Sequence, residues 1–473
     1  MKRVLESADW ARILIPLLFG VALALYPTSF QAAKALERGK VAETDQRPAL
    51  AATQLSGAAG ALPWRADLWE RAGIDALEGG DSAAAIPDLE RARKEGQLSL
   101  QGWLALGDAY QKQGDLAAGL ATWETRASLG GGSKELFERL VDGYDQQGDL
   151  EMAVQALRRW KASEPDQAEV LYQLGLHEAV IHPGDAGVIL SQAVAADSSL
   201  AEKTRTIQTA LNVASLEDDA AYKLLIIGRS LASLGDWKLA AETFRRGTLA
   251  RPDYAEVWAF LGEARQHLGK DGQAELTRAE VLNPDSVLVQ ALKALYWQRQ
   301  GKPARAVDSL TKVAGIEPEN PTWQLELGNA LAALGKLNQA LEHYQNAVRL
   351  APVDPFYWRA LAGFCVDFNV EMKTVGLPAA SQAVALDPND PSGLDLIGEI
   401  FLKTSDTLSA ERFLQRSLQA SPDYAPAHYH LGFLFLQAGK TSEAYQHLSR
   451  AAQLAAGQPL GKQAQRLIDQ YFR

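Results

Sequence analysis

The 473-residue chain is poor in the residues that build disulfides and metal sites. Its single cysteine, Cys365, has no partner within the chain, so a disulfide scaffold and a zinc site of paired cysteines are both excluded. Seven histidines are present, but no H-E-x-x-H motif holds any of them, and we predict packing or surface positions for all seven. Basic residues are outnumbered, with 47 Lys and Arg against 58 Asp and Glu, which argues against a general nucleic-acid binder.

Motifs for catalysis are equally scarce. The sequence contains neither a G-x-x-x-x-G-K-[ST] phosphate loop nor a G-x-S-x-G nucleophile elbow. Gly439-Lys440-Thr441 resembles the end of a phosphate loop, but Leu434 stands where its first glycine is required. Cys365 occupies an apolar packing position beside Leu361, which predicts a buried, inert thiol. We therefore predict no catalytic, cofactor-binding or metal-binding residue, no cofactor, and a protein that is not an enzyme.

Only one long apolar run is present, at 13–30 after a short N-terminal tail at 1–12. It carries no charge over 18 residues, and as a helix it would measure roughly 27 Å, close to the thickness of a bilayer core. Two interpretations stay open. The run is a transmembrane helix, or it is a signal segment cleaved near Ala22-Leu23-Ala24. The first predicts a single-pass membrane protein whose residues after this run lie outside the cytoplasm, and the second predicts a secreted protein.

The rest of the chain is periodic. Glycines recur at intervals of about 34 residues, as at Gly73 and Gly107, and the prolines from Pro252 to Pro422 follow at 32 to 36. Each interval contains two amphipathic apolar patterns, which predicts a pair of helices. In Trp103-x-x-Leu106-Gly107-x-x-Tyr110 the large side chains share one face, and Gly107 allows a neighbouring helix to approach closely.

The second helix of each interval carries a small residue at the expected contact with the first. These small residues are Ala51, Ala85, Gly119, Ala153, Ala186, Ala240, Gly272, Ala306, Ala340, Gly376, Ala410 and Ala444.

This pattern resembles the tetratricopeptide repeat, whose signature is W-x2-L-G-x2-Y followed by A, F or L, A and P. The best match is Leu327-Gly328, Leu331, Ala340, Tyr344, Ala347 and Pro352. The resemblance is to a membrane-anchored, bacterial-type member and implies an all-α fold. We expect a right-handed superhelical solenoid of about twelve helix-turn-helix repeats after one N-terminal apolar helix.

The spacing also predicts how the array is divided. We expect the first five repeats at 32–200, an interrupting helix or linker at 201–220 and the remaining seven repeats at 221–458. The last residues, 459–473, have the pattern of a polar-faced capping helix.

The first helix of each repeat offers a candidate binding surface. With the packing glycine counted as position 8, positions 4, 8 and 11 face inward, and positions 2, 5, 9 and 12 share another face. In the resembled family that face lines a concave groove. We predict partner contacts at acidic positions in the early repeats and at largely aromatic positions in the late ones: Glu70, Asp108, Glu138, Asp142, Phe356, Arg359, Tyr429 and Phe433.

Two functions are consistent with these features. The first is a non-enzymatic, membrane-anchored scaffold that binds protein or peptide partners, but no nucleic acid, along a concave repeat surface. The alternative is an accessory subunit of a membrane enzyme system for envelope polysaccharide assembly or export. It rests on the likeness of the segment at 63–69 to a junction in repeat tails of O-antigen-ligase-like proteins.

Overall fold

The structure, a computed structural model, describes residues 30–472 except residues 97 and 131. Throughout these described residues the regular secondary structure is helical, and no strand is present. The contacts divide the chain into two compact units, and the boundary in the sequence falls between Thr243 and Phe244, within helix α13. The chain is therefore all-α, as the apolar periodicity predicts.

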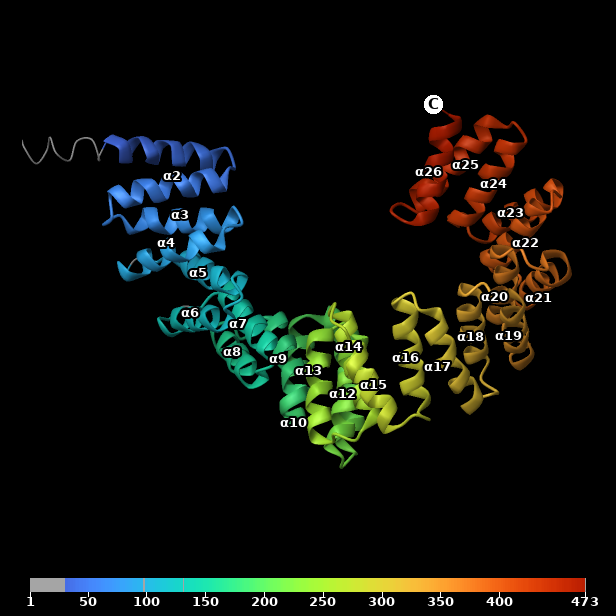
Figure 1. The fold of residues 1–473 in the computed structure, drawn as a ribbon, viewed down its shortest axis with the longest axis horizontal. Coiled ribbons are helices and arrows are strands. Elements are labelled where there is room, and N and C mark those ends of the chain that lie inside the picture. Colours follow the sequence, from blue (N-terminus) through green and yellow to red (C-terminus); the bar gives the residue numbers. More distant parts are fainter. Residues whose placement is uncertain (1–29, 97, 131, 473) are drawn as a thin grey trace, which may run out of the picture. The chain divides into compact units, whose positions relative to one another are not determined.

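In the first unit, helical residues 30–44 are followed by helices that pack side by side in chain order (Figure 1). Their bounds are α2 Pro48–Ala61, α3 Ala66–Glu78, α4 Ser82–Lys94, α5 Leu100–Lys112, α6 Leu116–Ser128, α7 Lys134–Gln147, α8 Leu150–Ser163, α9 Ala168–Ile181, α10 Pro183–Ala196, the 3-10 turn η1 Ser198–Leu200, α11 Ala201–Ser215, α12 Ala220–Ser233 and α13 Trp237–Ala250.

The second unit continues the same order of paired helices. Their bounds are α14 Ala255–His267, α15 Gln273–Leu282, α16 Val287–Arg299, α17 Pro303–Ile316, α18 Pro321–Ala333, α19 Leu337–Leu350, α20 Pro355–Asp367, the π-helical turn η2 Met372–Gly376, α21 Leu377–Leu386, α22 Pro391–Lys403, α23 Thr407–Ala420, α24 Ala425–Gln437, α25 Thr441–Leu454 and α26 Pro459–Tyr471.

A Gly-Asp pair links the two helices of several pairs. Gly114 has a φ of 87°, in the left-handed region that ends a helix with least strain when the residue is glycine. Asp115 follows it and accepts a hydrogen bond from the Ala118 N–H at 3.0 Å, which caps the start of α6. Gly148 and Asp149 repeat this arrangement before α8. In the pairs that contain them, these two residues thus specify the turn between the helices.

The small residues of the second helices lie in the core. All twelve positions from Ala51 to Ala444 are buried. On the facing first helix, a Cβ added to Gly107 would lie 2.0 Å from Nε1 of Trp123, a side chain with no exposed surface. Glycine is therefore required at that contact because any side chain would overlap the indole ring.

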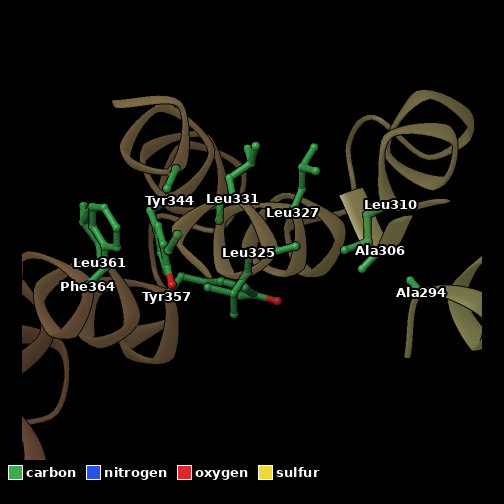
Figure 2. Packing of buried hydrophobic residues seen from close by; sticks show 14 of the residues in the cluster. Ala294, Ala306, Leu310, Leu325, Leu327, Leu331, Tyr344, Tyr357, Leu361 and Phe364 are labelled. Carbon is green, nitrogen blue, oxygen red and sulfur yellow. The ribbon is translucent and has the colours of Figure 1, made fainter. Parts of the chain in front are cut away.

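A large core cluster lies in the second unit, and Figure 2 shows part of it. Leu327 and Leu331 of α18 are buried, as is Tyr344 of α19. The Tyr344 ring stacks on Phe364 of α20, with 4.6 Å between ring centroids. Burial of these side chains between successive pairs supplies the apolar stabilisation that an isolated pair could not provide.

Two second helices begin later than their small residue. α15 starts immediately after Gly272, and α21 starts after Gly376, which ends the π-helical turn η2. Both helices contain 10 residues. A Cβ on Gly272 would lie 2.1 Å from the carbonyl oxygen of Gly262, so the backbones of this pair touch directly. At this position glycine, in place of the alanine found in most repeats, allows the two helices to approach more closely.

The inserted segment forms the 15-residue helix α11, which packs against α10 and α12. Ile207 and Leu211 of this helix are buried, while Val213 remains 44% exposed. The insertion is therefore a packed helix and adds to the apolar core of the first unit.

The membrane prediction requires correction. No helix within the described residues is long and apolar enough to cross a bilayer, because those with printed bounds contain at most 15 residues whereas a span needs about 20 apolar ones. On this finding the predicted single-pass membrane localisation is wrong. The apolar run at 13–30, taken as a transmembrane or signal segment, lies outside the described residues except for Phe30.

Candidate functional site

The acidic candidates on the first helices of the early repeats contact neighbouring repeats of the same chain. Asp108 of α5 accepts two hydrogen bonds from Arg139 of α7, at 2.6 Å from Nε and 2.8 Å from Nη2. Glu70 of α3 accepts a hydrogen bond from the backbone N–H of Ser99 at 3.0 Å and another from the Ser99 hydroxyl. These carboxylates therefore join successive first helices.

Glu138 and Asp142 of α7 are also paired with cations. Glu138 lies 3.5 Å from Nζ of Lys134, which also lies 2.7 Å from Glu169 on α9. Asp142 lies 3.2 Å from Nζ of Lys238 on α13, and both side chains are more than half exposed. Exposed pairs of this kind are weak and can exchange partners, so Asp142 keeps the accessibility that a binding residue needs.

The late candidates differ in exposure. Phe356 of α20 is 49% exposed and packs edge-on against Tyr357, with 5.2 Å between ring centroids. Arg359 on the same helix is paired with Asp390 at 3.0 Å. Phe356 is thus an apolar side chain open to solvent, while Arg359 is held at the start of the next first helix.

Tyr429 and Phe433 lie one turn apart on α24, and both are half-buried. Tyr429 packs against the cluster that α25 and α26 share, and burial raises the pKa of its hydroxyl. The structure therefore brings predicted residues together only where they share a helix. The acidic residues lie in the first compact unit and the aromatic residues lie in the second.

A cavity of about 620 Å³ spans three successive first helices in the first unit. Its wall includes Glu43 from the helical residues 30–44, Arg71, Ile74, Asp75 and Glu78 from α3, and Gln101 from α5. The connection before α2 adds Gln46 and Arg47, and α2 itself adds its first residue, Pro48. The repeat pattern alone did not predict this site, because Asp75 lies between the positions assigned to the groove and those assigned to the core.

Asp75 is the distinctive residue of this cavity. Its side chain is only 9% exposed, and its Oδ2 atom is buried without a hydrogen-bond partner among the described residues. Burial, together with the negative charges of Glu43 and Glu78, raises the pKa of Asp75 to about 6. The Arg71 guanidinium opposes this rise but is itself bound to Glu43 through both Nε and Nη2.

Two histidines form buried ion pairs. His177 of α9 lies 3.0 Å from Asp145 of α7, and its other ring nitrogen lies 2.8 Å from the carbonyl oxygen of Gln173. Burial alone would lower the pKa of His177, but the contact with Asp145 raises it overall. His430 of α24 is paired with Asp395 in the same way, at 2.9 Å.

These pairs join adjacent first helices rather than forming a metal site. Nowhere in the described part of the chain do three or more His, Cys, Asp or Glu side chains gather in a way that could hold a metal ion. A repeat-length spacing, 32 residues between Asp145 and His177, is the signal by which the sequence could have indicated such pairs.

Comparisons with known proteins agree with this architecture. Two family models described as tetratricopeptide repeat match residues 298–363 and 401–468, and residues 70–133 and 227–287. Together these segments contain more than half of the chain. No curated protein sequence matches it.

Several solved structures are similar. The Cut9–Hcn1 hetero-tetramer of the APC/C covers 94% of this chain and 98% of its own, at 14% identity and a TM-score of 0.40. Yeast Tom70 covers 93% and 95%, at 14% identity and a TM-score of 0.41. MamA of Desulfovibrio magneticus RS-1 covers 37% and 97%, at 21% identity and a TM-score of 0.32. With its paired helices, its buried small residues and the four matched segments, the chain belongs to the tetratricopeptide repeat family.

Proposed function

We propose that this protein is a non-enzymatic scaffold that binds protein or peptide partners along the face formed by its first helices. The observation that carries the proposal is the cavity over three successive first helices, from Glu43 to Gln101. A surface shared by consecutive repeats suits an extended ligand, because each repeat adds contacts in the same direction. Membership of the repeat family supports a role in protein interaction.

The proposed scaffold is an array of repeated helix pairs. Each first and second helix forms one unit, which gives twelve units over 32–458, with an insertion at 201–220 and α26 as the terminal cap. The polar outer face of α26 suits that role, since its buried residues are Gly461 and Ala464.

Within this surface, the residues most available to a partner are Asp142 and Phe356. Both are exposed, and both lie on first helices. Phe356 would supply an apolar anchor and Asp142 a charge that attracts a basic segment. The other predicted residues would shape the surface around Asp142 and Phe356 and would also hold neighbouring repeats together. They are Glu70, Asp108, Glu138, Arg359, Tyr429 and Phe433.

The polysaccharide-assembly alternative has no support from the structure or the comparisons.

A matched pair of substitutions to alanine tests the proposal. The full chain serves as bait for extracts of the cells in which it is made, and the retained proteins are identified by mass spectrometry. Phe356→Ala removes an exposed apolar side chain from a first helix, and Leu408→Ala removes one that is 83% exposed from second helix α23. We expect Phe356→Ala to reduce retention of a partner and Leu408→Ala to leave it unchanged. Equal retention by both variants, or no retained partner at all, would contradict the proposal.

A further inference from the structure

Two histidines of the last repeat contact each other through their ring nitrogens. His428 of α24 and His447 of α25 are half-buried, and their Nδ1 atoms lie 2.9 Å apart. The other ring nitrogen of His428, Nε2, lies 2.9 Å from the carbonyl oxygen of Pro422. Because a carbonyl oxygen can only accept, Nε2 of His428 carries a proton and donates it. In the neutral pair, Nδ1 of His428 therefore accepts the hydrogen bond that Nδ1 of His447 donates.

This contact tolerates one additional proton but not two. A first proton can bind Nε2 of His447, whose Nδ1 still donates to His428. A second proton has to occupy Nδ1 of His428, the atom that accepts the hydrogen bond. Two N–H groups would then face each other on two positively charged rings, so repulsion would replace the hydrogen bond. The contact between α24 and α25 is therefore sensitive to acid.

The equivalent contact in an earlier repeat lacks this sensitivity. Nδ1 of His343 on α19 lies 2.8 Å from Oε1 of Gln324 on α18, and the two residues are 19 positions apart, as are His428 and His447. The amide oxygen accepts a hydrogen bond from a neutral or a charged imidazole alike. In the last repeat an imidazole, which titrates, takes the place of an amide, which does not.

The surroundings of the pair disfavour a double positive charge. Burial, followed by the charge of His428, lowers the pKa of His447 below its ordinary value. Neither histidine has a carboxylate within ion-pair distance among residues 30–472 as described, whereas the neighbouring His430 is paired with Asp395. No opposite charge therefore offsets the repulsion between the two protonated rings.

Other charged groups lie on the elements that pack around the pair. They are Asp395, Glu399 and Lys403 on α22, Glu411, Arg412 and Arg416 on α23, Asp423 before α24, His430 on α24, Lys440 before α25, Glu443 and Arg450 on α25, and Lys462, Arg466 and Asp469 on α26. Arg450 is paired with Asp423, and His428 is the one charge that alters the pKa of His447.

We propose that the contact between His428 and His447 is a pH-sensitive switch, which holds the last helix pair together near neutral pH and loosens α25 and the capping helix α26 when both rings are protonated. Leu448, the residue after His447, has no exposed surface and belongs to the cluster that α25 shares with α26. Tyr429 of α24 packs against the same cluster. The inference goes beyond the proposed function, because it concerns one end of the array and needs no partner.

The lowered pKa of His447 decides the direction of the pH dependence. The folded chain binds this proton less tightly than the unfolded chain, so the stability is present above the ordinary pKa of 6.5 and is lost as the pH falls below it. The switch is therefore closed at about pH 7.5 and opens toward about pH 5.

Amide hydrogen exchange of the full-length protein tests the switch. Exchange is followed by mass spectrometry at about pH 7.5 and about pH 5, and each rate is corrected for the pH dependence of intrinsic exchange. We expect the protection of α25 and α26 to fall about fivefold or more at the lower pH, because local opening takes up the second proton. Unchanged protection of these helices would overturn the inference.

A single substitution supplies the matched control. His428→Gln recreates in the last repeat the contact that Gln324 makes with His343. The variant should lose less than about half of the protection that the wild type loses at the lower pH, because the amide keeps accepting from a charged His447. The pair of His430 with Asp395 is present in both proteins, so it does not contribute to the difference. Equal losses in the two proteins would overturn the inference.

A titration of the histidine rings needs no helix to open. Full-length protein labelled with nitrogen-15 at histidine is followed by NMR, and the two rings of the wild-type pair should titrate in two separate steps. In His428→Gln the pKa of His447 should rise, because the charge that lowers it is removed. Independent titration of both rings at the ordinary value would overturn the inference. Circular dichroism verifies that the variant is folded, and the wild-type titration decides the question if it is not.

Discussion

Arg139 on α7 binds Asp108 on α5, the preceding first helix, through two parallel hydrogen bonds of 2.6 and 2.8 Å. The side chains are 33% and 25% exposed, and the hydrogen bonds that Arg139 donates to Asp108 raise the pKa of Arg139 further above its ordinary value. The bidentate geometry fixes the position of one first helix relative to the next. A carboxylate predicted to contact a partner thus stabilises the stacking of repeats.

A double-mutant cycle measures this contact. Arg139→Gln and Asp108→Asn should each lower the free energy of unfolding in urea, with a coupling energy of about 1 kcal/mol because the pair is partly shielded from water. The same cycle on Arg205 and Glu202, whose side chains are 72% and 77% exposed, should give a coupling near zero. Equal coupling in the two cycles would contradict the structural role of Arg139.

Close helix contact at Gly107 makes a second prediction. Gly107→Ala should destabilise the first unit by about 1–3 kcal/mol, because the added Cβ would lie 2.0 Å from Trp123 Nε1. Gly57→Ala is the control, since Gly57 lies within α2 and its Cβ would meet no atom within 4 Å. That change should stabilise the helix by about 0.5–1 kcal/mol. Thermal unfolding followed by circular dichroism measures both, and a stabilised Gly107→Ala variant would show that the contact is loose.

The buried carboxylate of Asp75 makes a third prediction, for the pH dependence of stability. Its folded-state pKa of about 6 is above the ordinary value of 3.8, so the folded chain holds this proton more tightly than the unfolded chain. The resulting stability is present at low pH and is lost as the pH rises through about 6. Asp75→Asn should therefore gain stability relative to wild type between about pH 4 and pH 7, by about 3 kcal/mol at most.

Urea unfolding at a series of pH values measures this difference. Asp218→Asn provides the comparison, since its carboxylate is exposed and its stability curve should run parallel to that of wild type. If the curve of Asp75→Asn also ran parallel, the Asp75 pKa would not be raised in the folded protein.

The single cysteine makes a fourth prediction. Cys365 has no exposed surface, and burial, followed by the negative charge of Glu371, raises the pKa of its thiol to about 11. We expect iodoacetamide at about pH 8 to leave the folded protein unmodified and to react when urea unfolds the second unit. Rapid alkylation of the native protein, measured by intact mass, would show that α20 opens readily.

Much of the fold could be predicted from the sequence because the repeat restates the same local rules. Gly114 and Asp115 specify the end of one helix and the start of the next, and the buried small residues specify which faces meet. Local conformation and core pattern agree in the repeats, so the same structural indications recur many times along the sequence.

The binding face was harder to predict because its residues serve two purposes. Position within a first helix placed Asp108 on the face but did not indicate that Arg139, 31 residues later, would bind it. Asp75 escaped prediction because its environment depends on Glu43, which belongs to the preceding helix. Pairwise geometry between neighbouring repeats decides these roles, and apolar periodicity contains no information about it.

The central claim, that partners bind the face of the first helices, is tested most directly by site-specific photo-crosslinking. A benzoylphenylalanine placed at Gln101 on α5 reports on the cavity face, and one placed at Val188 on α10, which is 64% exposed, reports on a second helix. In the cells that make the protein, we predict a discrete adduct with a partner protein from position 101 and none from position 188. Adducts from position 188 alone, or equal adducts from both positions, would contradict the account.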